Sequence, residues 1–154
     1  MRLNLTIDRQ HKINDLPTDI LLKQWANSAY DNHDPSITAE AALLIVDRAT
    51  MTQYNRDYRK KNKATNVLSF PANLSAINGI IQLGDIVACA PIIHAEAEQQ
   101  DKTISAHWAH MMIHSTLHLQ NFDHSNTEEA QTMEALEISL LQQFGFSNPY
   151  LISD

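Results

Sequence analysis

This 154-residue sequence has a single cysteine and no long hydrophobic run, and its last third has no lysine or arginine. The single cysteine, Cys89, excludes an intrachain disulfide, and its apolar surroundings predict a small buried hydrophobic residue. Because 44% of the residues are hydrophobic, a chain of this length can bury a normal core without disulfides. We see no signal peptide and no apolar stretch of transmembrane length. We therefore expect one soluble, cytoplasmic domain over residues 1–154, with no membrane partner.

The basic residues are distributed unevenly along a chain whose net charge is −7. None follows Lys102, whereas six of the eleven fall within sixteen positions: Arg48, Arg56, Arg59, Lys60, Lys61 and Lys63. An acidic protein with one basic segment can hold a polyanion locally while the rest of its surface repels it. For any single lysine of this segment, the alternative is a solvated charged loop.

Hydrophobic periodicity predicts an α+β fold, in which helices pack on a small mixed β-sheet. Strands are expected at 2–8, 37–46, 65–71 and 80–90, with helices at 17–29, 91–100 and 105–120. Thr50 and Gln53 suggest a capping box that starts a helix ending near Arg59. Residues 125–128 are expected to cap a last helix, which Gly145 ends. Gly84 interrupts its strand and predicts a bulge or a close backbone approach.

The strongest chemical signal is a run of three histidines, His114, His118 and His124. Residues four apart share one face of a helix, so the first two point the same way. His124 can join them only if the chain turns back, and Asn121 is a residue that ends helices in the left-handed conformation. Three imidazoles with an open fourth position are typical of a catalytic zinc site, because structural sites are usually closed by a fourth ligand.

The same histidine spacing is that of the metzincin zinc peptidases. Those enzymes have a glutamate after the first histidine, where this chain has Ser115, and a glycine where it has Asn121. Without the glutamate that acts as general base, peptide hydrolysis by that route is disfavoured.

Further motifs surround the histidines. They comprise Leu-His-Leu at 117–119, Phe-Asp-His at 122–124, Asn55 and Arg59 ahead of 65–71 (Thr-Asn-Val-Leu-Ser-Phe-Pro), and Leu-Gly-Asp-Ile at 83–86. In their types and in their order along the chain, these motifs resemble those of the YbeY family of bacterial endoribonucleases and rRNA maturation factors. Two family glycines are replaced, by Ser115 and Asn121. Asn tolerates the same backbone shape, whereas Ser115 is expected to affect how closely a substrate approaches the helix.

The resemblance implies that His114, His118 and His124 bind one Zn²⁺ per chain and that Arg59 is catalytic. It also implies cleavage of single-stranded RNA, maturation of the 3′ end of 16S rRNA, and ribosome quality control. The implied partners are rRNA, the small ribosomal subunit and its proteins, and an assembly GTPase.

The residues suit such chemistry. A guanidinium such as that of Arg59 can neutralise charge on phosphoryl oxygens. Asp123 is a candidate partner that fixes the tautomer of a ligand, or else a turn-stabilising residue. Candidate RNA-binding residues are Arg56, Lys60, Lys61 and Lys63. A three-ligand site does not need His107 or His110, which we expect to be helix-surface or packing residues.

Two alternatives stay open. The first is a ribosome-assembly factor whose zinc holds the fold and which binds RNA without cleaving it. The second, disfavoured by Ser115, is a zinc hydrolase with another substrate. Whether a zinc-activated water or the 2′-hydroxyl of the RNA attacks the phosphate also stays open.

Overall fold

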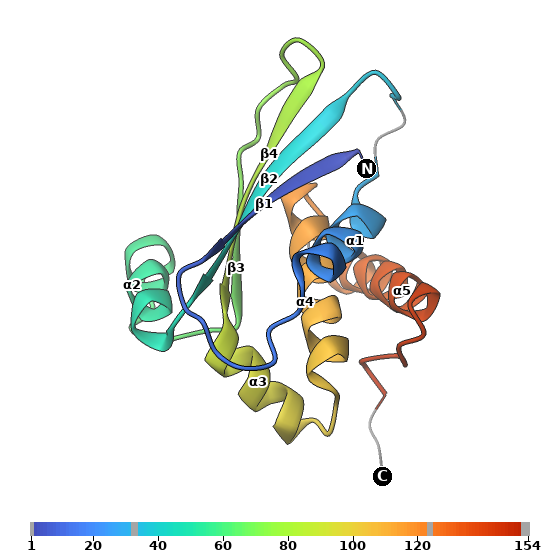
Figure 1. The fold of residues 1–154 in the computed structure, drawn as a ribbon. Helices are drawn as coiled ribbons and strands as arrows, with labels where there is room; N and C mark the ends of the chain where they lie inside the picture. Colours follow the sequence, from blue (N-terminus) through green and yellow to red (C-terminus); the bar gives the residue numbers. More distant parts are fainter. Residues whose placement is uncertain (1, 32–33, 123–124, 152–154) are drawn as a thin grey trace.

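The computed structural model describes residues 2–31, 34–122 and 125–151, and it confirms the predicted α+β fold (Figure 1). The elements are β1 (Leu3–Arg9), α1 (Asp19–Ala29), β2 (Thr38–Val46), α2 (Arg48–Arg59), β3 (Val67–Pro71), β4 (Ile80–Cys89), α3 (Ala90–Gln99), α4 (Ile104–Leu119) and α5 (Thr127–Gln143). None of these helices is long and apolar enough to cross a membrane.

The sheet has the strand order β1-β2-β4-β3. β1, β2 and β4 are parallel, whereas β3 pairs antiparallel with β4 and forms one edge. Helices α1, α4 and α5 lie on one side of the sheet and α2 on the other (Figure 1). This edge strand ends at Pro71, as the predicted strand over 65–71 does, because proline cannot donate the next ladder hydrogen bond.

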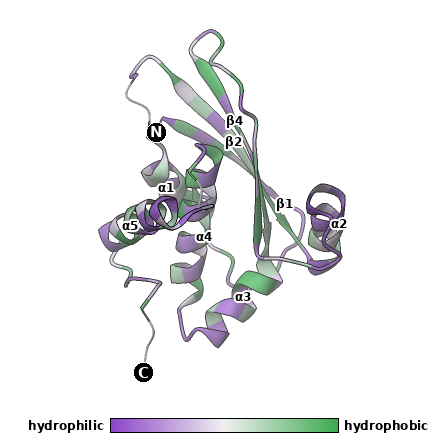
Figure 2. Ribbon diagram, turned by 180° about the vertical axis from the view of Figure 1, so that it is seen from behind, coloured by the Kyte–Doolittle hydropathy of each residue, from purple (hydrophilic) through white to green (hydrophobic). Residues whose placement is uncertain are grey.

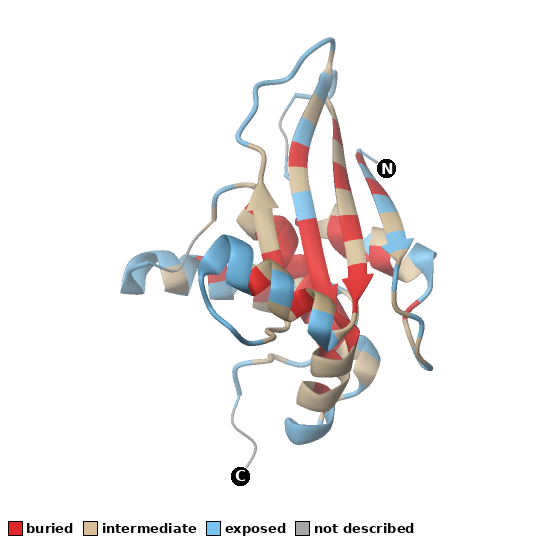
Figure 3. Cartoon of the chain, turned by 90° about the vertical axis from the view of Figure 1, so that its left-hand side faces the viewer, coloured by how far each residue is buried: buried red, intermediate tan, exposed pale blue. Residues whose placement is uncertain are grey.

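The sheet separates two hydrophobic cores, because alternate side chains of each strand point to opposite faces. The large core includes Leu43 of β2 and packs against α1, α4 and α5. The small core lies under α2 and includes Met51 and Cys89, which confirms the prediction of a buried cysteine. Buried residues fill the lower part of β4 and the end of β2 (Figure 3). Most residues of α2 are hydrophilic (Figure 2).

Gly84 lies at a bulge in β4, as predicted. Glu40 pairs with Gln82 but Ala41 pairs with Gly84, so that Leu83 is the extra residue. Gly84 has a φ of +136°, and a Cβ atom there would lie 2.1 Å from the carbonyl oxygen of Phe70. Only glycine therefore lets β3 approach β4 this closely, and β3 carries part of the functional site.

The histidine helix α4 is the central helix of the large core. It buries residues along nearly its whole length, including Trp108, Met112 and Ile113. The helix ends where the sequence predicted, because Asn121 has a φ of +68°. Its amide donates to the carbonyl of His118 at 3.0 Å, and the amide of Phe122 donates to that of Leu117 at 3.2 Å. These bonds close the helix end in the manner of a Schellman motif.

The predicted capping box at Thr50 is wrong. α2 begins at Arg48, and its N-cap is Asp47, whose carboxylate accepts a 2.8 Å hydrogen bond from the amide of Thr50. Asp is at least as good an N-cap as Thr. Thr50 therefore lies inside the first turn, where its amide is the group that is capped. At the other end, α2 finishes at Arg59 as predicted, and the cap of α5 is Asn126, within the predicted 125–128 segment.

Candidate metal and active site

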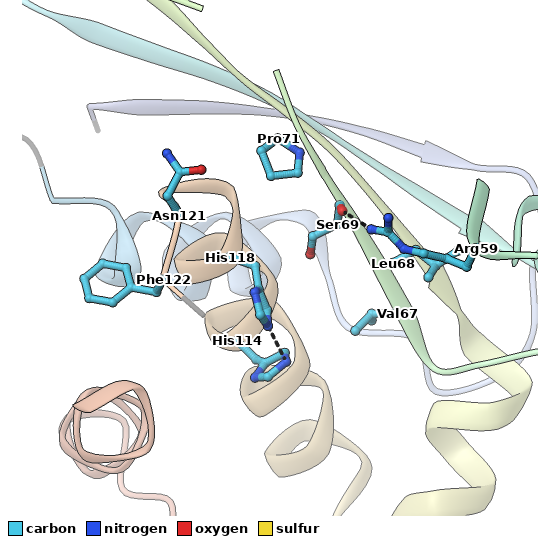
Figure 4. Close-up of a pocket in the computed structure, with 9 residues that line it drawn as sticks. All are labelled: Arg59, Val67, Leu68, Ser69, Pro71, His114, His118, Asn121 and Phe122. Carbon is cyan, nitrogen blue, oxygen red and sulfur yellow. Dashed lines mark hydrogen bonds between the residues drawn. The ribbon is translucent and has the colours of Figure 1, made fainter. Parts of the chain in front are cut away.

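A cavity of about 450 Å³ lies between the edge strand β3 and the C-terminal half of α4 (Figure 4). His114 and His118 line it from α4, Ser69 lines it from β3, and Arg59 lines it from the end of α2. The structure thus brings Arg59 and two of the three predicted ligands to one cavity. The third, His124, and its neighbour Asp123 lie outside the described residues.

His114 and His118 present a pair of ring nitrogens. Their Nε2 atoms are 3.1 Å apart, with the rings nearly perpendicular at 76°. Two imidazole nitrogens that bind one zinc at about 2.0–2.1 Å in tetrahedral geometry lie roughly 3.3 Å apart. The pair therefore fits a shared metal ion with little movement, and a set of neutral imidazoles suits zinc better than magnesium or calcium.

Glu137 of α5 is a candidate site residue that the sequence patterns did not predict. It is completely buried, and it accepts hydrogen bonds from His114 Nδ1, from His110 Nε2 at 3.2 Å and from the hydroxyl of Tyr150. Burial alone would raise the pKa of Glu137, but the hydrogen bonds from His110 and His114 lower it to about 2. The carboxylate is therefore ionised near neutral pH.

The ionised carboxylate determines the tautomer of His114. A carboxylate only accepts hydrogen bonds, so Nδ1 of His114 must carry the proton. In the neutral ring, Nε2 then has the lone pair, and this is the nitrogen that faces His118. Metal-binding histidines commonly have such a carboxylate partner, which also fixes the orientation of the ring.

The donor atoms of His110, His114 and Glu137 lie within 4.8 Å of one another, so these three residues could themselves hold a metal ion. His114 belongs both to this cluster and to the pair with His118. In the present geometry its Nδ1 is in direct contact with Glu137, and no ion fits between those two atoms. The Nε2 side, toward His118 and the cavity, is the more accessible place for an ion.

The structure decides the expectations for three other residues of α4. Of the two roles expected for His107 and His110, helix surface or packing, the packing role is confirmed, because both residues are buried. His107 is 2.9 Å from Glu96, and burial lowers its pKa. Ser115 is also completely buried, so its side chain does not meet a substrate at the helix surface.

Arg59 reaches across the edge of the sheet to the cavity. Its guanidinium carbon lies 5.4 Å from the centre of the Phe70 ring, and Nη2 donates to the carbonyl of Ser69 at 3.1 Å. In Figure 4 it lies across the cavity from His114 and His118. A hydrogen bond and an aromatic face thus restrain a cation opposite two potential metal ligands.

Comparisons with known proteins identify the family of the chain. The sequence model of the family described as Endoribonuclease YbeY matches residues 5–145. The chain belongs to the YbeY family. The Endoribonuclease YbeY of Cellvibrio japonicus (strain Ueda107) is 46% identical over 135 residues, which cover 88% of this chain and 76% of that protein.

A solved structure shares the fold of the chain. The solution structure of a Thermotoga maritima protein superposes with a TM-score of 0.57 at 18% identity, covering 97% of this chain and 100% of that one. At this identity the match shows the fold alone. The YbeY match covers every described residue of the cavity, Arg59 and the two histidines included.

Proposed function

We propose that this chain is a zinc-dependent endoribonuclease that cleaves single-stranded rRNA, in maturation of the 16S 3′ end and in ribosome quality control. One observation carries the proposal: a restrained guanidinium and a pair of imidazole nitrogens face the same cavity. The name of the Cellvibrio japonicus relative, an endoribonuclease, supports RNA as the substrate.

His114, His118 and His124 would hold the zinc ion. When bound, zinc would supply a Lewis acid that lowers the pKa of water and offsets negative charge on the phosphate. A cation there would also balance the buried charge of Glu137, because His114 lies between the two. Asp123 stays a candidate partner for His124.

Arg59 would bind the phosphate that is cleaved. Its planar guanidinium can donate two hydrogen bonds to phosphoryl oxygens, and its restraint by Ser69 and Phe70 reduces the entropy lost on binding. Four basic residues lie close to Arg59 in the sequence and are exposed, so they would hold neighbouring phosphates: Arg56, Lys60, Lys61 and Lys63. The nucleophile, water or the 2′-hydroxyl, can be identified from the products, because only the second leaves a 2′,3′-cyclic phosphate.

The other candidate function is an assembly factor that binds rRNA without cleaving it. It is favoured by the buried cluster of His110, His114 and Glu137, since a metal next to this cluster would stabilise the packing of α4 on α5. Cleavage by the purified protein separates the two functions.

We expect removal of zinc to abolish cleavage, and zinc but not magnesium to restore it. Imidazole nitrogens bind zinc far better than magnesium, which prefers oxygen ligands. The measurement is metal content together with cleavage of a single-stranded RNA by one purified sample, before chelation, after chelation and after each metal is added. The same RNA in a perfect duplex is the control. Equal activity with magnesium would show that this site is not the catalytic one, and a zinc-loaded protein that never cleaves would favour the assembly factor.

We expect Glu137→Gln to weaken zinc binding about 10- to 100-fold, the usual effect of removing the partner of a ligating histidine. Glutamine keeps the shape but lacks the charge that holds the proton on His114 Nδ1. Zinc affinity is measured by competition with a chelator, with Glu134→Gln on the exposed side of the same helix as the control. Unchanged affinity would reject the positioning role. A loss as complete as that of His118→Ala would instead make Glu137 a direct ligand.

A further inference from the structure

An aromatic cluster lies on the face of the sheet opposite to α4. We call it the aromatic platform and define it as Tyr54, Tyr58 and Phe70. The rings of Tyr54 and Tyr58 stack with centroids 6.1 Å apart and planes inclined by 22°, and the ring of Phe70 meets Tyr58 edge-on at 5.2 Å. Tyr54 and Phe70 pack on the small core, whereas Tyr58 remains 62% exposed. The platform thus presents an anchored aromatic ring to the solvent.

The platform adjoins the proposed active site. Phe70 lies between Ser69 and Pro71, which both line the cavity, and the guanidinium of Arg59 lies over its ring. Tyr58 and Arg59 therefore flank the same phenylalanine. A strand of RNA whose phosphate meets Arg59 would carry its neighbouring base toward Tyr58.

The charges around the platform select a polyanion. Arg56, Lys60, Lys61 and Lys63 are exposed on the end of α2 and on the segment that follows it, in a chain of net charge −7. Exposed aromatic rings within a basic surface are the two components of single-strand nucleic-acid sites, in which cations follow the backbone and bases stack on the rings. Met51, Tyr54 and Phe70 belong to the small core under α2 or pack against it, whereas Tyr58 does not.

We propose that Tyr58 stacks an unpaired RNA base adjacent to the nucleotide bound by Arg59, and that this contact selects single strands over duplexes. The proposal rests on the proposed function. A base in a duplex already stacks on its neighbours and offers no free face at this place, whereas an unpaired base does. Every base has an aromatic face, so the contact tolerates any sequence. Tyr58 is a specificity residue in this scheme, and the cleavage chemistry remains with Arg59 and the metal site.

The test uses the zinc-loaded protein and a short, fluorescein-labelled single-stranded RNA. Binding is followed by anisotropy and cleavage on gels, so that the two are read separately. Tyr58→Ala is expected to weaken binding about tenfold or more, within the range for stacking one base. The saturated single-turnover rate should stay within about twofold. Tyr58→Phe should bind as the unmodified protein does, because it keeps the ring. Ile20→Ala, which removes a side chain that is 68% exposed on α1, is the control for loss of exposed apolar surface.

A second comparison identifies the base. Abasic sites are placed one at a time along the RNA, and one position should weaken binding to the unmodified protein about as much as Tyr58→Ala does. The same abasic RNA should bind Tyr58→Ala no worse than intact RNA does. The salt dependence of binding should be the same for Tyr58→Ala, since no phosphate contact is lost, whereas Lys61→Ala should reduce it.

The outcomes separate this proposal from the one on which it rests. If Tyr58→Ala binds RNA normally, or if no abasic position matters, the stacking contact is rejected even though RNA is cleaved. Such a result would leave a partner of other chemistry, such as an acidic protein segment, for the platform. If the unmodified protein binds RNA and never cleaves it, the proposed activity is rejected while the comparison of Tyr58 variants still measures stacking.

Discussion

Arg59→Ala is expected to slow cleavage of saturating single-stranded RNA at least about a hundredfold, the usual cost of removing one donor to a transition-state charge. The guanidinium is held against Ser69 and Phe70, opposite the two histidines, so it meets charge that develops on the phosphate. An interaction that strengthens in the transition state lowers the rate when lost, even with substrate fully bound. The measurement is the single-turnover rate at saturating RNA.

Two variants control for general attraction of RNA. Arg56→Ala removes an exposed arginine from the same helix, and Lys61→Ala removes a lysine just beyond it. Both should weaken binding and reduce its salt dependence, because each phosphate contact releases counterions, but both should keep the saturated rate. Circular dichroism of each variant is the control for folding. If Arg59→Ala and Lys61→Ala slow the saturated rate equally, or if neither does, Arg59 is only one cation among several.

His114→Ala is expected to eliminate stoichiometric zinc and, with it, cleavage. The variant removes the central member of the proposed ligand set, whose Nε2 is 3.1 Å from that of His118 and whose Nδ1 is bound by Glu137. Metal content of the purified protein and its cleavage of single-stranded RNA are the measurements. Full zinc occupancy in folded His114→Ala protein would reject the assignment.

Folding has to be separated from metal binding in this experiment. His114→Ala leaves the buried carboxylate of Glu137 with one hydrogen-bond donor fewer, and an unpaired buried charge is destabilising. His118→Ala keeps the network around Glu137 and should lose zinc equally. His11→Ala, in the loop after β1, is the control histidine and should retain the metal.

The sequence was sufficient to predict the parts of the fold and site that depend on local patterns. The positions of the strands, the extent of α4 and its end at Asn121 follow from periodicity and from residues that end helices. The close approach at Gly84 was predictable because a glycine interrupted an otherwise apolar strand. The start of α2 was misplaced because Asp47 and Thr50 are both good capping residues three positions apart, and their local sequence does not decide between them.

Glu137 could not be assigned from local pattern alone, although a signal was present. Met133, Glu137 and Leu141 lie four residues apart, so an acidic residue occupies the buried face of α5 between two apolar ones. A charge on that face needs a partner, but the partners, His110, His114 and Tyr150, come from other elements. Only the packing of α5 on α4 shows which groups meet it. Sequence proximity suggested Asp123 as a partner of His124 or as a turn-stabilising residue, but it cannot indicate a long-range contact such as that between Glu137 and His114.

The separation of the molecule into two cores has a consequence for how such an enzyme can diverge or be redesigned. The proposed metal ligands belong to α4, at the centre of the large core, where most substitutions would disturb packing. Tyr58 and the basic residues belong to α2 and to the segment that follows it, and α2 rests on the small core across the sheet. New preferences for RNA can therefore arise by exchanging the outer surface of α2 and the segment that follows it, provided that Arg59 is kept, while the metal site is inherited unchanged. A library randomised at 56–63, with residue 59 kept as arginine, would sample binding preferences at positions that are all exposed.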